Sequence, residues 1–311
     1  MRAAYLNRVA GPEGLLVGDL PRPAPAEGQV VVRVRAAAVT PTEFKWFPTF
    51  RARNGEPRPF PIVPGHEFCG VIEDLGDAVS GFSRGESVYG MNDWFSNGAQ
   101  AEYCVAPANA LSPRPESLRE TEAATVPISA LTAWQGLFDR CQLKAGESVL
   151  VHGGAGGVGL FAVQLAHWRG ARVFATASKR NADFVSSLGA DEVINYKTTP
   201  FEQRARDIDV VFDTVGGETL TRSWSVLRPE GRLVTVASPN ETTPAHRVRD
   251  AFFIVEPNQA QLSEISRLLD SRILHASVAE VFPLGAVRAA YVRAQQGGML
   301  GKIAIKVDGE T

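Results

Sequence analysis

The chain has 311 residues, of which 21% are charged, and its formal net charge is −2. This length suits about two domains, and the balanced charge leaves no basic stripe of the kind that binds nucleic acid. The apolar runs are far shorter than the roughly 20 residues that cross a bilayer, and the N-terminal residues lack the apolar core of a secretory signal. We therefore expect a cytoplasmic protein that binds neither nucleic acid nor membranes.

The first 120 residues have the sequence pattern of a compact β domain. Short apolar runs at 30–35 and 70–75 predict strands, and proline and glycine separate them. Prolines also crowd 21–25 and 57–64, where a fixed φ and a missing N–H favour extended connectors over helices. We expect this domain to cover 1–120.

The central part opens with an apolar run at 149–152 that stops at a cluster of glycines and resumes over 160–166. This pattern is typical of a strand, a tight turn and a helix. The turn contains Gly154-x-Gly156-x-x-Gly159, in which the first glycine turns the chain, the second lets the backbone approach a pyrophosphate, and the third lets helix touch strand. Phosphates would bind the N–H groups that open the helix, where the helix dipole favours negative charge. The sequence therefore predicts a dinucleotide site.

Strand and helix signals alternate after this turn. The helix is expected to end near Trp168, before Gly170. The further strands of this part are predicted at 171–176, 192–196, 208–213 and 232–237. Because alternating strands and helices form parallel sheets that are covered on both faces, we predict an α/β fold with a Rossmann doubly wound parallel sheet over 121–256.

The C-terminal part begins with a short apolar run at 251–255, which predicts an edge strand. A helix then follows, with apolar residues at helical spacing, namely Leu262, Ile265, Leu268 and Leu269. The last predicted elements, in order a strand, a helix and a strand, are 278–282, 284–296 and 302–307. We expect 257–311 to return to the first domain.

In the predicted Rossmann sheet, the end of the second strand, at 171–176, indicates which dinucleotide binds. NAD proteins place an acid about 20 residues after the glycines, where it binds the ribose 2′-hydroxyl. This chain has Ala177 there, followed by Ser178, Lys179 and Arg180, a hydroxyl and two cations that suit a 2′-phosphate. We therefore predict NADP(H) as the cofactor; the alternative is that Lys179 and Arg180 are merely solvated residues that open a helix.

Further motifs give the chain a resemblance to a known superfamily over essentially its whole length. Besides the glycine turn, they are Val39-Thr-Pro-Thr-Glu-Phe-Lys45, Pro64-Gly-His-Glu-Phe-Cys-Gly-Val71, Gly98-Ala-Gln-Ala-Glu-Tyr103, Ala130-Leu-Thr-Ala-Trp134, Leu188-Gly-Ala-Asp-Glu-Val193, Asp213-Thr-Val-Gly-Gly217 and Gly301-Lys-Ile303. They resemble the medium-chain dehydrogenases/reductases, and most of all the zinc-lacking quinone oxidoreductase branch, whose members use NADPH to reduce quinones or activated enones. The resemblance implies a mostly β GroES-like catalytic domain, a Rossmann domain and a cleft between them.

The zinc ligands of other members of that superfamily can be compared residue by residue. A catalytic zinc needs three protein ligands. Thr40 aligns with a ligand cysteine, and the third ligand position aligns near Ile128, so His66 alone remains. The cysteine-rich structural zinc loop is also absent between Met91 and Tyr103. We predict no bound metal.

Without a metal, hydride transfer to a quinone or enone needs a hydrogen-bond donor at the carbonyl oxygen and, in the end, a proton. The candidate catalytic residues are Thr40, Lys45 and His66. Thr40 stands where many relatives carry asparagine, but a threonine before Pro41 also caps turns. Lys45 resembles a lysine that is common in the branch, but lysines usually face solvent. His66 suits proton delivery, but it also suits a buried network with Glu67.

The resemblance also implies further cofactor contacts. Thr132 would meet the nicotinamide half, and the backbone of Phe253 and Ile254 would hold the carboxamide. The remaining implied contacts, at the turn and at the ends of later strands, are Ala155, Gly157, Val158, Tyr196, Thr214, Val215, Ala237 and Ser238. The aromatic residues that would line a slot for a flat substrate ring, or else pack in the core, are Trp46, Phe47, Phe50, Trp94 and Phe95.

These observations favour an NADPH-dependent, zinc-independent reductase of quinones or other α,β-unsaturated carbonyl compounds. One alternative is an enoyl reductase, although many such enzymes carry a tyrosine after the position of Thr40 and this chain has none between Tyr5 and Tyr89. Another is an NADPH-binding sensor or scaffold with little turnover. If 251–255 forms an exposed edge strand, it would pair with its copy, so we also expect a homodimer.

Overall fold

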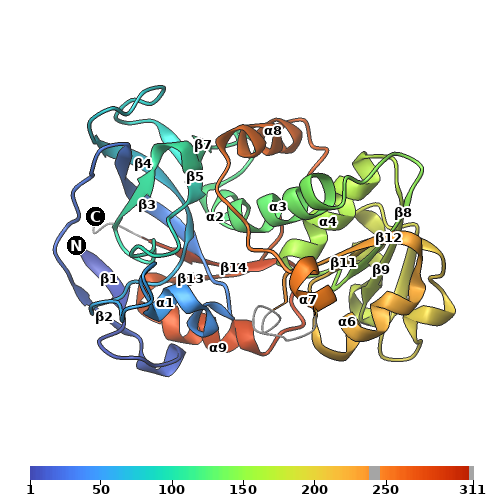
Figure 1. The fold of residues 1–311 in the computed structure, drawn as a ribbon. Coiled ribbons are helices and arrows are strands. Elements are labelled where there is room, and N and C mark those ends of the chain that lie inside the picture. Colours follow the sequence, from blue (N-terminus) through green and yellow to red (C-terminus); the bar gives the residue numbers. More distant parts are fainter. Residues whose placement is uncertain (238–245, 308–311) are drawn as a thin grey trace. The chain divides into compact units, whose positions relative to one another are not determined.

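The computed structural model describes residues 1–237 and 246–307, which divide into two compact units (Figure 1). The first unit contains 1–128, 257–272 and the residues from 276 onward, and the second contains 129–256 and 273–275. At the end of the N-terminal part of the first unit, the Ile128 N–H donates to Oε2 of buried Glu67 at 3.0 Å. Likewise His275 joins the second unit, where its N–H donates to Gln164 Oε1 at 2.7 Å.

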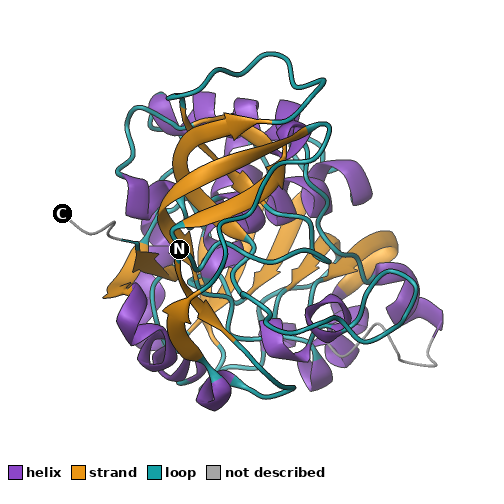
Figure 2. Cartoon of the chain, turned by 90° about the vertical axis from the view of Figure 1, so that its left-hand side faces the viewer, coloured by secondary structure: helices purple, strands orange, loops and turns teal. Residues whose placement is uncertain are grey.

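The first unit is built mainly from strands, drawn in orange in Figure 2. Its larger sheet has the order β13-β14-β3-β4-β5-β7, with β6 also paired to β3, and β1 and β2 form a separate antiparallel pair. The strands of this unit are β1 Arg2–Tyr5, β2 Leu16–Asp19, β3 Gln29–Ala38, β4 Glu67–Leu75, β5 Ser87–Met91, β6 Tyr103–Pro107, β7 Leu111–Pro113, β13 Val278–Pro283 and β14 Lys302–Lys306. The central strand β3 is rich in valine and alanine, and most of its residues are buried, as β-branched residues on a packed sheet should be.

The C-terminal segments return to this unit. Strand β14 pairs with β3 antiparallel and with β13 parallel, so it joins the end of the chain to the N-terminal sheet. The helices of the unit are α1 Phe47–Phe50, α2 Glu120–Ala123, α8 Gln259–Asp270 and α9 Val287–Gln295. Helix α8 buries the four apolar residues that its sequence period predicts.

The second unit contains a parallel sheet with the strand order β10-β9-β8-β11-β12. Its strands are β8 Ser148–His152, β9 Arg172–Ala177, β10 Glu192–Asn195, β11 Ile208–Asp213 and β12 Leu227–Thr235. Every residue of β11 is buried, as expected for a central parallel strand that is covered on both faces. The chain order reverses between β8 and β11, and ligands of doubly wound sheets bind at the carboxyl ends of the strands beside such a reversal.

Helices cover this sheet, and Figure 1 shows α4 and α6 on opposite sides of it. The helices of the unit are α3 Pro127–Trp134, which starts at the end of the first unit, α4 Gly157–Trp168, α5 Ala182–Ser187, α6 Gly217–Ser223 and α7 His246–Ala251. Among the described residues, no helix is long and apolar enough to cross a bilayer.

The edge strand predicted at 251–255 does not form. Ala251 ends α7, and Phe252 makes one parallel bridge to Thr235 and no longer pairing. The start of the run continues a helix instead: the Phe252 N–H completes the last turn of α7 by donating to the Val248 carbonyl oxygen at 3.0 Å, so it is not available to a ladder. The next residue after the run, Glu256, is bonded through its N–H and its carbonyl oxygen to the side chain of Gln135.

Candidate functional site

One edge of the second unit collects most of the predicted cofactor residues. The glycine turn follows β8, and the other predicted groups follow the carboxyl ends of the neighbouring parallel strands. In chain order these are Ser178, Lys179 and Arg180 after β9, Tyr196 after β10, Thr214 and Val215 after β11, and Ala237 after β12. Ser238 lies outside the described residues. Since the carboxyl ends of parallel strands share one edge, the fold brings segments from five strands to the same place.

The glycine turn has the geometry that a pyrophosphate needs. Gly153, rather than Gly154, takes the left-handed conformation that turns the chain, with φ of 77°. A Cβ on Gly159 would lie 2.1 Å from the Gly153 carbonyl oxygen, so only glycine lets α4 approach the strand. A Cβ on Gly156 would meet nothing closer than 3.4 Å, which leaves this side of the turn open. Gly156 is the N-cap of α4, and no side chain of the described residues caps that helix. Its first N–H groups are therefore available to a phosphate.

A buried histidine, His152, is linked to this turn through Thr176. The Gly153 N–H donates to Thr176 Oγ1 at 3.1 Å, and Thr176 Oγ1 lies 3.3 Å from Nδ1 of His152. On the other side of the ring, His152 Nε2 lies 2.9 Å from Ser223 Oγ, which itself donates to a carbonyl of α6 at 2.7 Å. Because the only hydroxyl proton of Ser223 is used there, we assign the ring proton of His152 to Nε2.

His152 is neutral in this environment. Its exposed fraction is 0%, and burial lowers its pKa to about 4, although Asp213 opposes that change. The neutral ring accepts a hydrogen bond at one nitrogen and donates one at the other, so each of its polar atoms has a partner. Thr214 adds a further hydrogen bond, from Oγ1 to the His152 carbonyl oxygen at 2.7 Å. The strand end that carries the glycine turn is therefore fixed through both the side chain and the backbone of one residue.

The segment after β9 is basic and open. Ser178 is half-buried, while Lys179 and Arg180 are exposed in the 3-10 turn Lys179–Asn181. Ala177 ends the strand, so no carboxylate occupies the position at which NAD proteins carry an acid. Tyr196 is 59% exposed. This segment therefore presents two exposed cations and a hydroxyl at the end of β9.

The other predicted cofactor residues have varied surroundings. Thr132 is buried in α3, and Phe253 is buried, with its N–H donating to the Thr235 carbonyl oxygen at 3.3 Å. Ile254 and Val215 are about half exposed, at 50% and 53%.

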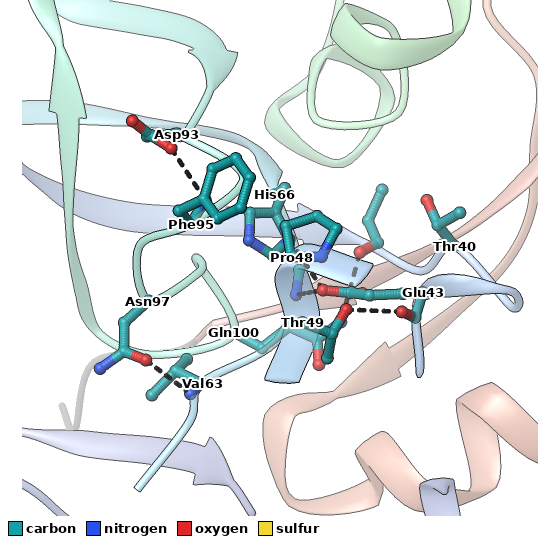
Figure 3. Close-up of polar contacts among 12 residues, drawn as sticks. Thr40, Glu43, Pro48, Thr49, Val63, His66, Asp93, Phe95, Asn97 and Gln100 are labelled. Atoms are coloured by element: carbon teal, nitrogen blue, oxygen red, sulfur yellow. Dashed lines mark hydrogen bonds and ion pairs between the residues drawn. The ribbon is translucent and has the colours of Figure 1, made fainter. Parts of the chain in front are cut away.

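A buried carboxylate binds one of the predicted catalytic residues of the first unit, His66 (Figure 3). Glu43, which is fully buried, accepts hydrogen bonds from the Gly65 N–H, from Nδ1 of His66 and from the hydroxyl of Tyr291, each at 2.8 Å. Gln100 donates to Tyr291 at 2.9 Å. The sequence-based prediction that paired His66 with Glu67 is wrong. Neighbouring residues at the start of a strand face opposite sides, so Glu67 points away from the His66 ring.

This carboxylate fixes the orientation and tautomer of His66. Burial is the largest influence and raises the pKa of Glu43, but the hydrogen bonds from His66, Gly65 and Tyr291 together hold that pKa below its ordinary value. Glu43 is therefore an acceptor only, and Nδ1 of His66 carries the proton. The other nitrogen, Nε2, is buried and has no hydrogen-bond partner among the described residues. This atom is therefore available to accept a hydrogen bond from a water or a ligand.

Thr40, which is half-buried, contacts a second polar cluster. Nζ of Lys302, in β14, contacts Oε1 of Glu67 and lies 3.3 Å from Oγ1 of Thr40. Lys45 is exposed at the end of the 3-10 turn Glu43–Lys45, and no hydrogen bond or ion pair joins it to either cluster within the described ranges. The structure thus brings Thr40 and His66 to neighbouring networks and leaves Lys45 outside them.

Four of the five predicted slot aromatics lie together in pairs. Trp46 meets Trp94 edge to face at 5.2 Å, and Phe47 meets Phe95 at 6.5 Å between ring centres. Trp94 also lies 5.3 Å from the ring of His66. Phe50 instead packs against the hydrophobic core of the first unit. The aromatic surface beside His66 is therefore made by the loop before α1 and by the loop that contains Trp94.

The residues at the predicted metal position do not fit zinc. Of the three positions compared with zinc enzymes, His66 supplies an imidazole, Thr40 a hydroxyl that is bonded to a cation, and Ile128 nothing. In the described ranges, no three His, Cys, Asp or Glu side chains are arranged to hold a metal ion. The three cysteines are free and buried.

Several residues of these networks could not be predicted from the sequence. Glu43 lies inside a recognised motif, but nothing in the motif says that it faces His66. Tyr291 and Lys302 lie some 250 residues downstream of their partners. The only available signal was the motif Gly301-Lys-Ile303, which contains Lys302 without indicating its contact.

Two protein-family models match the chain. Residues 26–116 match the family model of the alcohol dehydrogenase GroES-like domain, and residues 188–305 match that of a zinc-binding dehydrogenase. These matches cover much of the first unit and the later part of the second.

Individual relatives resemble the chain over most of its length. It is 33% identical to a probable zinc-binding oxidoreductase, mitochondrial, from Arthroderma benhamiae, over 92% of this chain and 91% of that protein. It is 36% identical to a 2-methylene-furan-3-one reductase from Solanum lycopersicum, over 79% of this chain and 62% of that protein. The solved structure of a quinone oxidoreductase from Coxiella burnetii superposes with a TM-score of 0.90 at 30% identity, covering 99% of both chains.

Proposed function

Because the chain belongs to the medium-chain dehydrogenase/reductase superfamily, among the reductases that resemble quinone oxidoreductases, we propose that it is an NADPH-dependent, zinc-independent reductase of quinones or other α,β-unsaturated carbonyl compounds. The family implies a nicotinamide cofactor. The observation that carries the proposal is the open glycine turn at the end of β8, beside the basic segment that follows β9.

The preference for NADPH rests on charge. Lys179 and Arg180 are exposed cations beside the position where an acid would repel a 2′-phosphate. A hydrogen bond to a charged phosphate contributes about 1.5–3 kcal/mol, or less where water competes. We expect the Lys179→Ala/Arg180→Ala variant to bind NADPH at least about tenfold more weakly and NADH unchanged, as measured by nucleotide fluorescence. Wild-type protein that binds NADH as tightly as NADPH would refute the preference.

The proposal of zinc independence rests on the missing ligands. A single imidazole does not hold the ion against water, and the hydroxyl of Thr40 already accepts from a lysine. Elemental analysis of protein purified without added metal should find substoichiometric zinc. Activity should also survive dialysis against a chelator, and loss of activity that zinc restores would contradict the proposal.

The residues of the first unit suit the acceptor half of the reaction. Bound NADPH supplies one hydride, that is, two electrons with one hydrogen nucleus, and solvent supplies the one proton that completes the reduced product. We assign hydrogen-bond donation to the substrate oxygen to Thr40. Nε2 of His66, the buried atom that lacks a partner among the described residues, carries no proton in this tautomer, so we assign to it the acceptance of a hydrogen bond from the ligand or from the solvent that delivers the proton. Trp46 and Trp94 provide flat apolar surface for a ring.

A panel of acceptors tests the substrate class. NADPH oxidation should be fastest with 9,10-phenanthrenequinone or 1,4-naphthoquinone, slower with an alkenal, and slowest with crotonyl-CoA. The relative named as a reductase of a methylene furanone supports enones as a second substrate class. Tight NADPH binding without oxidation by any acceptor would favour a sensor or scaffold instead.

Two expectations remain proposals of their own. We propose a homodimer on the family resemblance alone, because the edge strand that suggested pairing is reduced to a single bridge. Sedimentation that finds only monomer at micromolar concentration would contradict it. We also propose a cytoplasmic location, which is consistent with three free, buried cysteines and is checked by cell fractionation.

A further inference from the structure

A buried cation meets Thr40. Lys302 has a side chain that is 10% exposed, and its Nζ contacts Glu67, whose side chain is 1% exposed. The second oxygen of Glu67 accepts the N–H of Ile128. Burial raises the pKa of Glu67 above its ordinary value, and the charge of Lys302 opposes that change. Loop, strand β4 and strand β14 thus place a hydroxyl, a carboxylate and an ammonium group together.

Such an ion pair is not explained by stability. Taking two charges out of water costs several kcal/mol per ion, and an apolar pair of similar volume is often as stable or more stable. Removing one partner, in contrast, leaves an uncompensated buried charge. The presence of the pair beside a predicted catalytic residue therefore suggests a functional reason.

The direction of the hydrogen bond supplies that reason. An ammonium group has three donors and no acceptor, so Thr40 Oγ1 must accept from Lys302. The hydroxyl proton of Thr40 is then directed elsewhere, and no described residue accepts it. Thr40 is thereby made a donor toward any ligand, and the positive charge behind it strengthens that donation.

We propose that Lys302 is a positioning residue that acts through Thr40, and that the pair binds the substrate oxygen as negative charge develops on it. This inference rests on the proposed function. No bond to Lys302 or Thr40 forms or breaks: the substrate gains a hydride and one solvent proton, and the pair stabilises the oxygen between these two events. Anionic oxygens of planar rings, such as phenolates, are the ligands that this pair favours.

The test is a mutant cycle that avoids a lone buried charge. Thr40→Val removes the donor, Glu67→Gln/Lys302→Met removes the cation together with its partner, and the third variant combines all three substitutions. Removing one such donor typically lowers kcat about 100-fold. We expect a loss of that order from Thr40→Val and about tenfold from Glu67→Gln/Lys302→Met, with no further loss in the combined variant. NADPH affinity should be unchanged throughout. Thr40→Ser, which keeps the hydroxyl, should restore activity.

A second readout does not need turnover. Binding of 4-nitrophenolate, followed by its absorbance in the presence of NADP⁺, should weaken about tenfold in Thr40→Val and in Glu67→Gln/Lys302→Met, again without further loss in the combined variant. Additive losses, or wild-type behaviour of Glu67→Gln/Lys302→Met, would overturn the inference. So would failure of the wild type to bind the phenolate. If the wild type binds NADPH and 4-nitrophenolate but reduces no acceptor, the proposed function is wrong. In that case the phenolate affinities of the three variants still test whether Lys302 acts through Thr40.

Discussion

The buried histidine behind the glycine turn makes stability depend on pH. In the folded chain, burial lowers the pKa of His152 from 6.5 to about 4. An unfolded histidine is solvated and titrates near its ordinary value, so between these two values the unfolded chain binds more protons than the folded one. The contribution of His152 is therefore complete above about pH 6.5 and is lost as the pH falls toward 4.

The size of this effect follows from the two pKa values. At about pH 5, proton linkage through His152 alone lowers the free energy of unfolding by about 2 kcal/mol relative to about pH 7.5. The matched variant is His152→Gln, whose amide can still donate to Ser223 but does not titrate. Urea unfolding of the whole chain, followed by circular dichroism at both pH values, should show a loss about 2 kcal/mol smaller in this variant than in the wild type.

A second variant separates this histidine from the others. His167 is exposed near the end of α4, and His167→Gln is the control that makes the same substitution at an exposed histidine. Equal pH dependence in the wild type and in His152→Gln would show that His152 is not buried as a neutral ring, and the assignment of its proton would fall with it.

Three other substitutions, with one control at Tyr196, test the turn and the Glu43 network. Gly159→Ala should lower the free energy of unfolding by about 1–3 kcal/mol, because its Cβ would overlap the Gly153 carbonyl, and thermal unfolding measures this. Gly156→Ala has room for its Cβ, so it should unfold like the wild type yet bind NADPH about tenfold more weakly in a fluorescence titration; unchanged affinity would contradict a phosphate site at this turn. Tyr291→Phe removes a donor from buried Glu43 and should cost about 1–3 kcal/mol in urea unfolding, whereas Tyr196→Phe, at an exposed position, should cost almost nothing.

Local sequence patterns predicted most of the second unit. Strand β11 begins and ends at the predicted residues, and α4 ends at Trp168 as expected. These elements are strongly periodic or uniformly apolar, so their type depends on contacts within a short window. The exception, 251–255, has an apolar run as convincing as the others. Its first residues belong to the end of α7, where the Phe252 N–H donates to the Val248 carbonyl oxygen, so the run continues a helix that the sequence pattern did not predict.

The sequence by itself determined the two-part architecture, the glycine turn and the basic segment after β9, because each depends on neighbouring residues and on the geometry of a strand followed by a helix. Only the tertiary structure decided that Glu43 rather than Glu67 binds His66, and that Lys302 reaches Thr40. These contacts join elements far apart in the chain, and their partners are fixed by strand pairing and by the face on which each side chain projects. A motif identifies such residues, but the fold decides which of them meet.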